Sequence, residues 1–183
     1  MKNRLTVVAG PTAVGKGTVV RRILDENAHV HLSVSATTRA PRPGEQNGVD
    51  YYFLSHEEFD RMIEAGEMLE FAVVHGANKY GTPRKPVEDA LARGEQVILE
   101  IDIQGARQVK VSMPEALLVF IAPPSWQELE RRLASRGTES VAEQQRRLET
   151  AKTELEAKSE FDAVVINEDV AKCAQEVLDL MQA

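Results

Sequence analysis

A glycine-rich segment close to the start of the chain limits its possible folds more than any other feature. At Gly10 begins the sequence GPTAVGKGT, which has the spacing Gly-x4-Gly-Lys. An apolar, β-branched run precedes it over residues 5–9, and residues 18–26 follow with the apolar spacing of a helix. A buried strand, a glycine-rich turn and a helix in this order are typical of a phosphate-binding loop in an α/β protein.

The residue types of this segment suit phosphate groups. Glycines allow backbone N–H groups to turn inward around phosphate oxygens, and the start of the helix adds unpaired donors. Lys16 adds a mobile positive charge at the β- and γ-phosphates. Gly17 stands where Ser or Thr is usual, so we expect water to mediate the contact with Mg²⁺. A strand–turn–helix connection with chance glycines is the alternative, and the Lys at this spacing disfavours it.

Strand-like and helix-like segments alternate along the rest of the chain, which predicts a mostly parallel sheet with helices on both faces. Residues 34–82 interrupt this alternation and predict an insertion with its own small sheet. We expect strands at residues 29–34, 68–74, 97–102, 117–121 and 163–166, and helices that begin near Ser55, Thr82-Pro83, Ser125 and Ser140 and cover residues 170–181. The pairs Ser55–Glu58, Ser125–Glu128 and Ser140–Glu143 have the spacing of capping boxes.

Length and composition set further bounds. The 183 residues suffice for one domain with small insertions, and the single cysteine, Cys173, favours a reducing compartment, so we expect a cytoplasmic protein. The apolar runs are too short to span a membrane, and the first residues do not resemble a signal peptide. A net charge of −7 disfavours nucleic acid as a partner. It does not exclude anionic substrates, because a local group of cations can act within an acidic chain.

Two further groups of residues indicate additional contacts, one with a second anion and one with Mg²⁺ or a ligand. Arg39 and Arg42 lie in a loop that prolines stiffen, where two guanidinium groups can bind one anion, and Tyr51 and Tyr80 can add phenolic donors. Solvated loop arginines are the alternative for this pair. Glu100 and Asp102 end an apolar strand-like run, and their side chains, two residues apart, are expected on one side of it, near the phosphate loop.

With these motifs in place, the sequence closely resembles the guanylate kinase family over nearly its whole length. The matching stretches are Gly10 to Thr18, Ser33 to Glu45, Asn47 to Tyr51, Glu67 to Phe71, Tyr80 to Thr82, Leu99 to Gly105, Arg136 to Glu139 and Val165 to Asn167. The resemblance implies an α/β fold: a P-loop NTPase core with a five-stranded parallel sheet flanked by helices, a small mixed-sheet insertion and a helical lid. It divides the chain into core at 1–33, 85–124 and 151–183, a GMP-binding subdomain at 34–84 and a lid at 125–150.

The resemblance also implies a transferase that uses Mg²⁺ to move the γ-phosphoryl group of ATP reversibly to GMP, and to dGMP, in guanine nucleotide recycling and GTP supply. ATP and GMP or dGMP are the expected partners, with no nucleic acid, membrane or obligate protein partner. Implied catalytic residues are Lys16, Arg39, Arg42, Arg136 and Arg147. Implied ATP-binding residues are Gly10, Pro11, Thr12, Ala13, Val14, Gly15, Lys16, Gly17, Thr18, Arg132, Arg136 and Asn167. Implied GMP-binding residues are Ser35, Arg39, Arg42, Tyr51, Glu70, Tyr80, Thr82 and Asp102, and Thr18 and Glu100 are expected near the metal, with Asp102 as the alternative to Glu100.

The chemistry of Glu70 supports guanine independently. Guanine presents the N1–H and the N2 amine side by side, so one carboxylate can accept both, whereas adenine presents an unprotonated N1 there. Ala13 replaces a glycine that is common in related loops, and it fits only if its backbone angles accept a β-carbon.

Some alternatives stay open at this point. Arg131 and Arg146 are neighbours of the implied lid arginines, and all of these could instead pair with glutamates on a helix surface. The chain could phosphorylate another nucleoside monophosphate. It could also be a non-catalytic domain of the same fold that binds proteins, although the complete phosphate loop disfavours that reading.

Overall fold

Parallel strands form the central sheet of the computed structural model, which describes residues 4–74, 77–135 and 141–183. Within these residues the sheet has five strands in the order β2-β7-β1-β8-β9, and each neighbouring pair is parallel. Their bounds, in that order, are Val30–Leu32, Gln96–Glu100, Leu5–Ala9, Leu117–Ala122 and Ala163–Ile166. The predicted five-stranded parallel core is therefore confirmed.

The central strand β1 shows why the sheet must be covered on both faces. All five of its residues are buried. Because side chains alternate along a strand, Leu5, Val7 and Ala9 join one hydrophobic cluster and Val8 joins the cluster on the opposite face. A strand that is apolar on both sides has no face to offer to water, which is typical of a parallel sheet inside an α/β protein.

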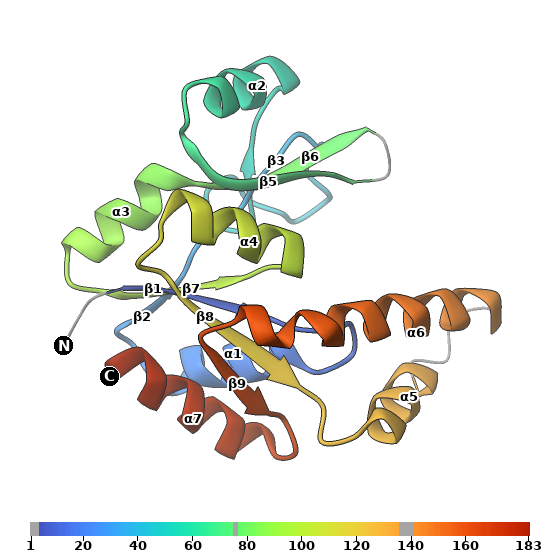
Figure 1. Cartoon of the computed structure of the whole chain (residues 1–183). Coiled ribbons are helices and arrows are strands. Elements are labelled where there is room, and N and C mark those ends of the chain that lie inside the picture. The colour runs from blue at the N-terminus through green and yellow to red at the C-terminus, as the bar shows by residue number, and fades with distance from the viewer. Residues whose placement is uncertain (1–3, 75–76, 136–140) are drawn as a thin grey trace.

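Helices cover the two faces in pairs (Figure 1). On one face lie α3 (Arg84–Ala92) and α4 (Ile103–Ser112), and on the other lie α1 (Lys16–Glu26) and α7 (Val170–Gln182). Beyond the carboxyl ends of the strands lie α5 (Trp126–Ala134) and α6 (Val141–Glu156), and a 3-10 turn, Ala157–Glu160, leads from α6 toward β9.

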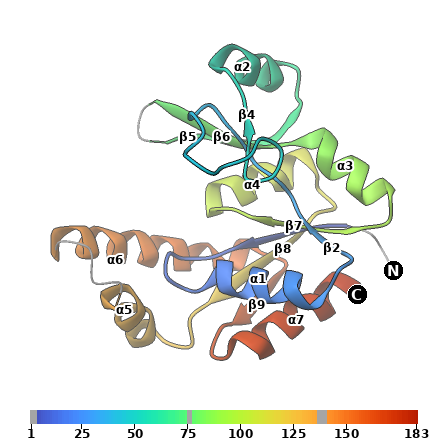
Figure 2. The same cartoon turned by 180° about the vertical axis from the view of Figure 1, so that it is seen from behind.

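A second, mixed sheet lies apart from the core, as Figure 2 shows from behind. Its order is β4-β3-β6-β5, with β3–β4 parallel and the other two pairs antiparallel. The bounds are Tyr52–Phe53 for β4, Ala36–Thr37 for β3, Asn78–Pro83 for β6 and Met68–Val74 for β5, and α2 (His56–Glu64) packs beside them. The sheet has a small core of its own around Ala36, Phe59 and Met68. The predicted insertion with its own sheet is confirmed.

Side chains of α4 attach the mixed sheet to the core. The Gln108 amide both accepts from the backbone N–H of Phe71, at 3.1 Å, and donates to the Phe71 carbonyl, at 3.0 Å. The Ser112 hydroxyl donates to the Leu69 carbonyl at 2.8 Å. These bonds fix β5, and with it the carboxylate of Glu70, relative to the helix that follows β7.

Several expected boundaries were wrong. The strand predicted over 97–102 ends at Glu100. Asp102 is instead the N-cap of α4, a helix that was not predicted from the sequence. The Asp102 carboxylate accepts from the backbone N–H of Gly105 at 2.7 Å. Glu100 and Asp102 therefore do not continue one strand. The helix predicted to begin near Thr82-Pro83 begins at Arg84, since Pro83 ends β6 and is the N-cap of α3.

Of the three predicted capping boxes, that of Ser55 and Glu58 is confirmed at the start of α2. Ser125 caps α5, but Glu128 accepts from Arg131 and Arg132 instead of returning to the cap, and these guanidinium groups lower the pKa of Glu128 to about 2. The pair at Ser140 lies outside the described residues.

The core of the mixed sheet can be tested with two phenylalanines. Phe59, on α2, is fully buried against the mixed sheet, whereas Phe71, on β5 of that sheet, is 37 % exposed. We expect Phe59→Ala to lower the free energy of unfolding by about 3–5 kcal/mol, because a large buried side chain is replaced by a cavity. Urea denaturation followed by circular dichroism measures this. Phe71→Ala is the control, with an expected loss of less than about 1 kcal/mol; equal losses in the two variants would contradict the assigned core.

Candidate active site

The phosphate loop joins β1 to α1 at the carboxyl end of the central strand (Figures 1 and 2). Gly10 has φ +151°, and a Cβ there would overlap the carbonyl oxygen of Ile121 on β8. Gly15, the N-cap of α1, has φ +93°, a left-handed conformation that favours glycine. The two glycines that define the motif are thus required by backbone geometry, and the loop ends at the N-terminus of a helix, where anions bind.

Lys16 is turned back onto this loop. Its ammonium Nζ donates to the carbonyl of Gly10 at 2.7 Å and to that of Pro11 at 3.1 Å. The positive charge therefore lies at the loop itself, where the phosphates of a nucleotide would lie.

Ala13, which stands where related loops commonly have glycine, adopts the left-handed backbone conformation that residues with a β-carbon rarely take. Its φ is +61°, and it is the one non-glycine residue with positive φ in the described part of the chain. An L-residue with a β-carbon pays about 1–2 kcal/mol in this region, so the loop stores strain at this position.

The carboxylate of Glu100 faces the phosphate loop from the end of β7. A Cβ built on Gly17 would lie 3.4 Å from Glu100 Oε1, so the position at which Ser or Thr is usual directly adjoins this carboxylate. Burial raises the pKa of Glu100, and the charge of Lys16 opposes that rise. Thr18 is exposed one residue further along α1. A single carboxylate beside a phosphate loop is a suitable ligand for Mg²⁺, because proteins usually hold this ion through one or two carboxylates while it keeps several waters.

On the other side of the loop, Asn167 and Arg132 contact the same backbone. Asn167, 3 % exposed, donates from Nδ2 to the carbonyl of Val14 at 2.8 Å, and Arg132 donates to the same carbonyl at 3.2 Å. Arg132 also donates to the backbone carbonyl of Asn167 at 3.1 Å. Among the protein atoms described, Asn167 Oδ1 is buried with no hydrogen-bond partner, so a ligand donor at this position would be favourable.

The predicted lid arginines differ in their surroundings. Arg131 and Arg146 are exposed, whereas Arg132 and Arg147 are half-buried. This difference favours Arg132 and Arg147 over their neighbours for the predicted lid role. Arg136 lies outside the described residues.

The residues expected to bind a second phosphate lie together in the mixed sheet and its loop. Tyr51 is central: the Arg39 guanidinium carbon lies 5.5 Å from its ring centroid, and the Tyr80 ring lies 6.0 Å away. Glu45 holds the arginine loop, because it accepts from the Arg39 guanidinium at 2.8 and 3.0 Å and from the backbone N–H of Arg42 at 2.7 Å. The Arg39 ion pair lowers the pKa of Glu45. Glu45 received no role from the sequence, although it lies in the matching stretch.

Glu70 and Thr82 form a buried polar pair across β5 and β6. Glu70 is 8 % exposed and Thr82 is fully buried, and the Thr82 hydroxyl donates to Glu70 Oε1 at 2.7 Å. Burial raises the pKa of Glu70, and the charge of Asp102 raises it further. The second oxygen, Oε2, and Asp102 Oδ1 both lie close to Gly105, at 3.1 and 3.3 Å from the position of a Cβ there. The two acidic groups are therefore neighbours, as the resemblance implied.

A cavity of about 340 Å³ lies between the mixed sheet with its loop and the ends of β2 and β7. Ser35, Tyr51 and Thr82 line it from the mixed sheet and its loop, and Glu100 lines it from the core. Asp102 lines a different cavity, of about 480 Å³, together with Glu154 of α6. Four of the predicted site residues thus line one cavity and Asp102 lines another.

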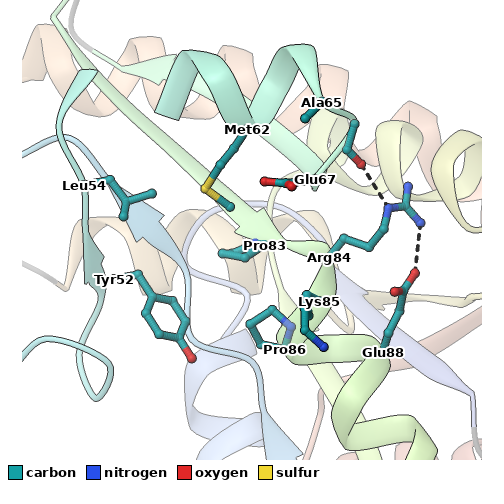
Figure 3. Close-up of a pocket in the computed structure, with 11 residues that line it drawn as sticks. Tyr52, Leu54, Met62, Ala65, Glu67, Pro83, Arg84, Lys85, Pro86 and Glu88 are labelled. Carbon is teal, nitrogen blue, oxygen red and sulfur yellow. Dashed lines mark hydrogen bonds and ion pairs between the residues drawn. The ribbon is translucent and has the colours of Figure 1, made fainter. Parts of the chain in front are cut away.

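A larger cavity, of about 570 Å³, lies outside this arrangement (Figure 3). Tyr52, Leu54, Met62 and Pro83 form its apolar wall, and Arg84 forms part of its charged edge, with bonds to the Gly66 carbonyl and to Glu88. None of the predicted site residues lines it. Its size alone does not make it the active site.

A phosphate loop at the carboxyl edge of a parallel sheet, with a separate mixed sheet whose loop carries Arg39, Arg42 and Tyr51, is typical of a P-loop kinase. A sequence model of the guanylate kinase family matches residues 2–183, and the chain belongs to this family. It is therefore an enzyme, a phosphotransferase, as the sequence predicted.

Relatives and solved structures agree with this assignment. The chain is 63 % identical over 180 residues to the guanylate kinase of Leifsonia xyli, covering 98 % of this chain and 71 % of the relative. It is 56 % identical to that of Thermobifida fusca, covering 98 % and 91 %. The crystal structure of guanylate kinase from Anaplasma phagocytophilum superposes with a TM-score of 0.73 at 35 % identity, over 98 % of this chain and 85 % of that one. In the part of the chain that the structure describes, no helix is long and apolar enough to cross a membrane.

The strain at Ala13 leads to a stability test. We expect Ala13→Gly to raise the free energy of unfolding by about 0.5–1 kcal/mol, because relief of the left-handed strain outweighs the added flexibility of the unfolded chain. Thermal unfolding at neutral pH measures the change. Ala40→Gly, in an exposed loop without positive φ, is the matched control and should be slightly destabilising. A loss of stability in Ala13→Gly would show that the loop is not strained there.

Proposed function

We propose that this chain transfers the γ-phosphoryl group of ATP to GMP, and to dGMP, in a reversible reaction that requires Mg²⁺. The observation that carries the choice of acceptor is the buried pair of Glu70 and Thr82. One oxygen of Glu70 accepts from the Thr82 hydroxyl, but each carboxylate oxygen has two lone pairs, so the two oxygens can still accept from the N1–H and the N2 amine of guanine. Since a buried carboxylate would face the unprotonated N1 of adenine without a proton between them, AMP is disfavoured by about 1–3 kcal/mol or more.

In this proposal the two sheets hold the two nucleotides. The phosphate loop from Gly10 to Thr18 and Lys16 hold the phosphates of ATP, and the unpaired Oδ1 of Asn167 is available to a donor of its base. Arg39, Arg42, Tyr51 and Tyr80 hold the phosphate of GMP, and Ser35 and Asp102 lie beside its base. Arg39 must exchange Glu45 for the phosphate, which is a stronger partner because it carries more charge and more acceptor oxygens.

The chemical step needs charge compensation rather than a general base. The attacking oxygen of GMP belongs to a phosphate that is ionised near neutral pH, so no proton has to be removed from it. The work is to bring two anions together and to balance the charge of the transferred group. Lys16, Arg39 and Arg147 provide positive charge, and Glu100, with Thr18 nearby, would hold Mg²⁺, which neutralises charge on the β- and γ-phosphates when bound. We propose the segment of residues 125–150, with Arg132, Arg136 and Arg147, as the part that excludes water during transfer.

Two finer expectations stay predictions. A cytoplasmic location rests on the single cysteine of the sequence, and the expected absence of a nucleic-acid partner rests on its net charge.

A coupled assay of ADP release tests the reaction. With Mg²⁺ and ATP, we expect turnover with GMP and dGMP and little with AMP or UMP. Lys16→Ala should lower kcat by about 10³-fold or more, in the range of other cations that stabilise phosphoryl transfer. Lys172→Ala, on the exposed side of α7, is the matched control and should keep wild-type turnover. A preference for AMP would contradict the acceptor, and a purified protein without turnover would favour a non-catalytic binding domain.

Glu70→Gln tests the guanine contact separately. The amide retains an acceptor for Thr82 but places a donor against guanine, so kcat/KM for GMP should fall by about 10- to 100-fold with little change in KM for ATP. In the absence of nucleotide, the same substitution should stabilise the folded protein. Because the folded state raises the pKa of Glu70, the wild type loses stability as pH rises toward and through that pKa, and the variant does not. Thermal unfolding at pH 5 and pH 8 should show a larger gain for Glu70→Gln at pH 8; an unchanged GMP preference would reject the role of Glu70.

A further inference from the structure

A carboxylate from the far end of the sequence contacts the phosphate loop, and neither the motifs nor the proposed reaction uses it. The backbone N–H of Thr12 donates to Glu154 Oε2 at 3.3 Å, across 142 residues of sequence. Glu154 lies on α6, and Figures 1 and 2 both show this helix running beside the loop between β1 and α1.

The surroundings of Glu154 argue against a chance surface contact. Its side chain is half-buried, whereas Glu149 and Glu156 on the same helix are exposed. Burial raises its pKa, the charge of Asp102 adds to that rise, and the Thr12 N–H and Lys16 oppose it. A carboxylate that loses hydration at a helix needs a compensating contact, and the loop provides it.

The helix on which Glu154 lies also carries Arg147, seven residues earlier. Seven residues are about two turns and leave the two side chains only about 20° apart around the helix axis, separated by roughly 10 Å along it. Both are half-buried, in agreement with one shared face. The face of α6 that binds the phosphate loop through Glu154 is therefore the face that presents Arg147.

We infer that Glu154 is a positioning residue: its bond to Thr12 fixes the rotation of α6 about its axis, so that Arg147 points toward the phosphate that the loop holds. This inference rests on the role proposed above for Arg147. Ala151, Leu148 and Leu155 pack α6 against the core, but apolar packing is not directional, whereas the bond from Thr12 to Glu154 is. With a radius of about 5–6 Å including side chains, a rotation of about 20° moves a side-chain tip by roughly 2 Å. Misplacement of a catalytic group by about 1 Å can cost on the order of 10²-fold in rate.

The test compares two uncharged variants of equal length. Glu154→Gln keeps an oxygen that accepts from the Thr12 N–H, whereas Glu154→Met fills the same volume without that oxygen. We expect Glu154→Met to lower kcat by about 10- to 100-fold with little change in KM for GMP. Glu154→Gln should recover most of this loss. Glu156→Met, at an exposed position two residues further on, is the matched control and should behave as the wild type.

A double-mutant cycle with Arg147→Ala identifies the route of the effect. If Glu154 acts through Arg147, then Glu154→Met should change kcat by less than about threefold in the Arg147→Ala background. Thermal unfolding of each variant separates this from general destabilisation. The same loss of kcat in both backgrounds would overturn the inference, and so would a lower KM for ATP in Glu154→Gln, because the carboxylate would then be a competitor of the ATP phosphates.

The cycle also separates this inference from the proposed function. Absence of GMP turnover in the wild type, or wild-type kcat in Arg147→Ala alone, would contradict the proposed reaction or the role of Arg147. A large effect of Arg147→Ala together with no effect of Glu154→Met would contradict only the positioning role of Glu154.

Discussion

The meeting of β1 and α1 at a loop of inward-turned N–H groups is the constraint on which the rest of the site depends. A parallel sheet ends all of its strands at one edge, so whatever follows β7, β8 and β9 comes close to the loop that follows β1. Glu100 at the end of β7 and Asn167 after β9 reach the loop in this way, although nearly seventy residues separate them in the sequence. One loop thus organises residues from several segments of the chain.

A second constraint is the balance of charge around these anion sites. In the described structure, two side chains proposed to hold phosphate already have internal partners: Lys16 has the carbonyls of its own loop, and Arg39 has Glu45. Each partner is a weaker or less complete match than a phosphate. The acidic residues that give the chain its net charge of −7 therefore include some that hold cationic groups in place. Net charge describes the chain as a whole and does not describe this local arrangement.

The acceptor side illustrates how stability and recognition compete. Glu70 is held as a buried carboxylate next to Asp102, and both burial and the neighbouring charge raise its pKa. Contacts with α4 and β6 offset part of the free energy that burial of this carboxylate costs. Gln108 on α4 binds the backbone of Phe71, beside Glu70, and the Thr82 hydroxyl on β6 donates to one oxygen of Glu70. A buried carboxylate whose pKa is raised both by desolvation and by a neighbouring charge is typical of a functional site.

Much of this protein was determined by the sequence alone. Local patterns predicted the five strands of the parallel sheet, the phosphate loop and most helices, because a buried parallel strand is apolar throughout and glycines are needed where φ is positive. They predicted an insertion with its own sheet, but of its four strands only β5, because β3, β4 and β6 carry no continuous apolar run. The resemblance of the whole chain assigned the family. The sequence did not predict α4. Asp102 was expected at the end of a strand but is the N-cap of a helix, because a polar residue after an apolar run fits either position. Only the tertiary structure brought Glu154 to Thr12, because their contact follows from how α6 crosses the edge of the sheet, which no local spacing encodes.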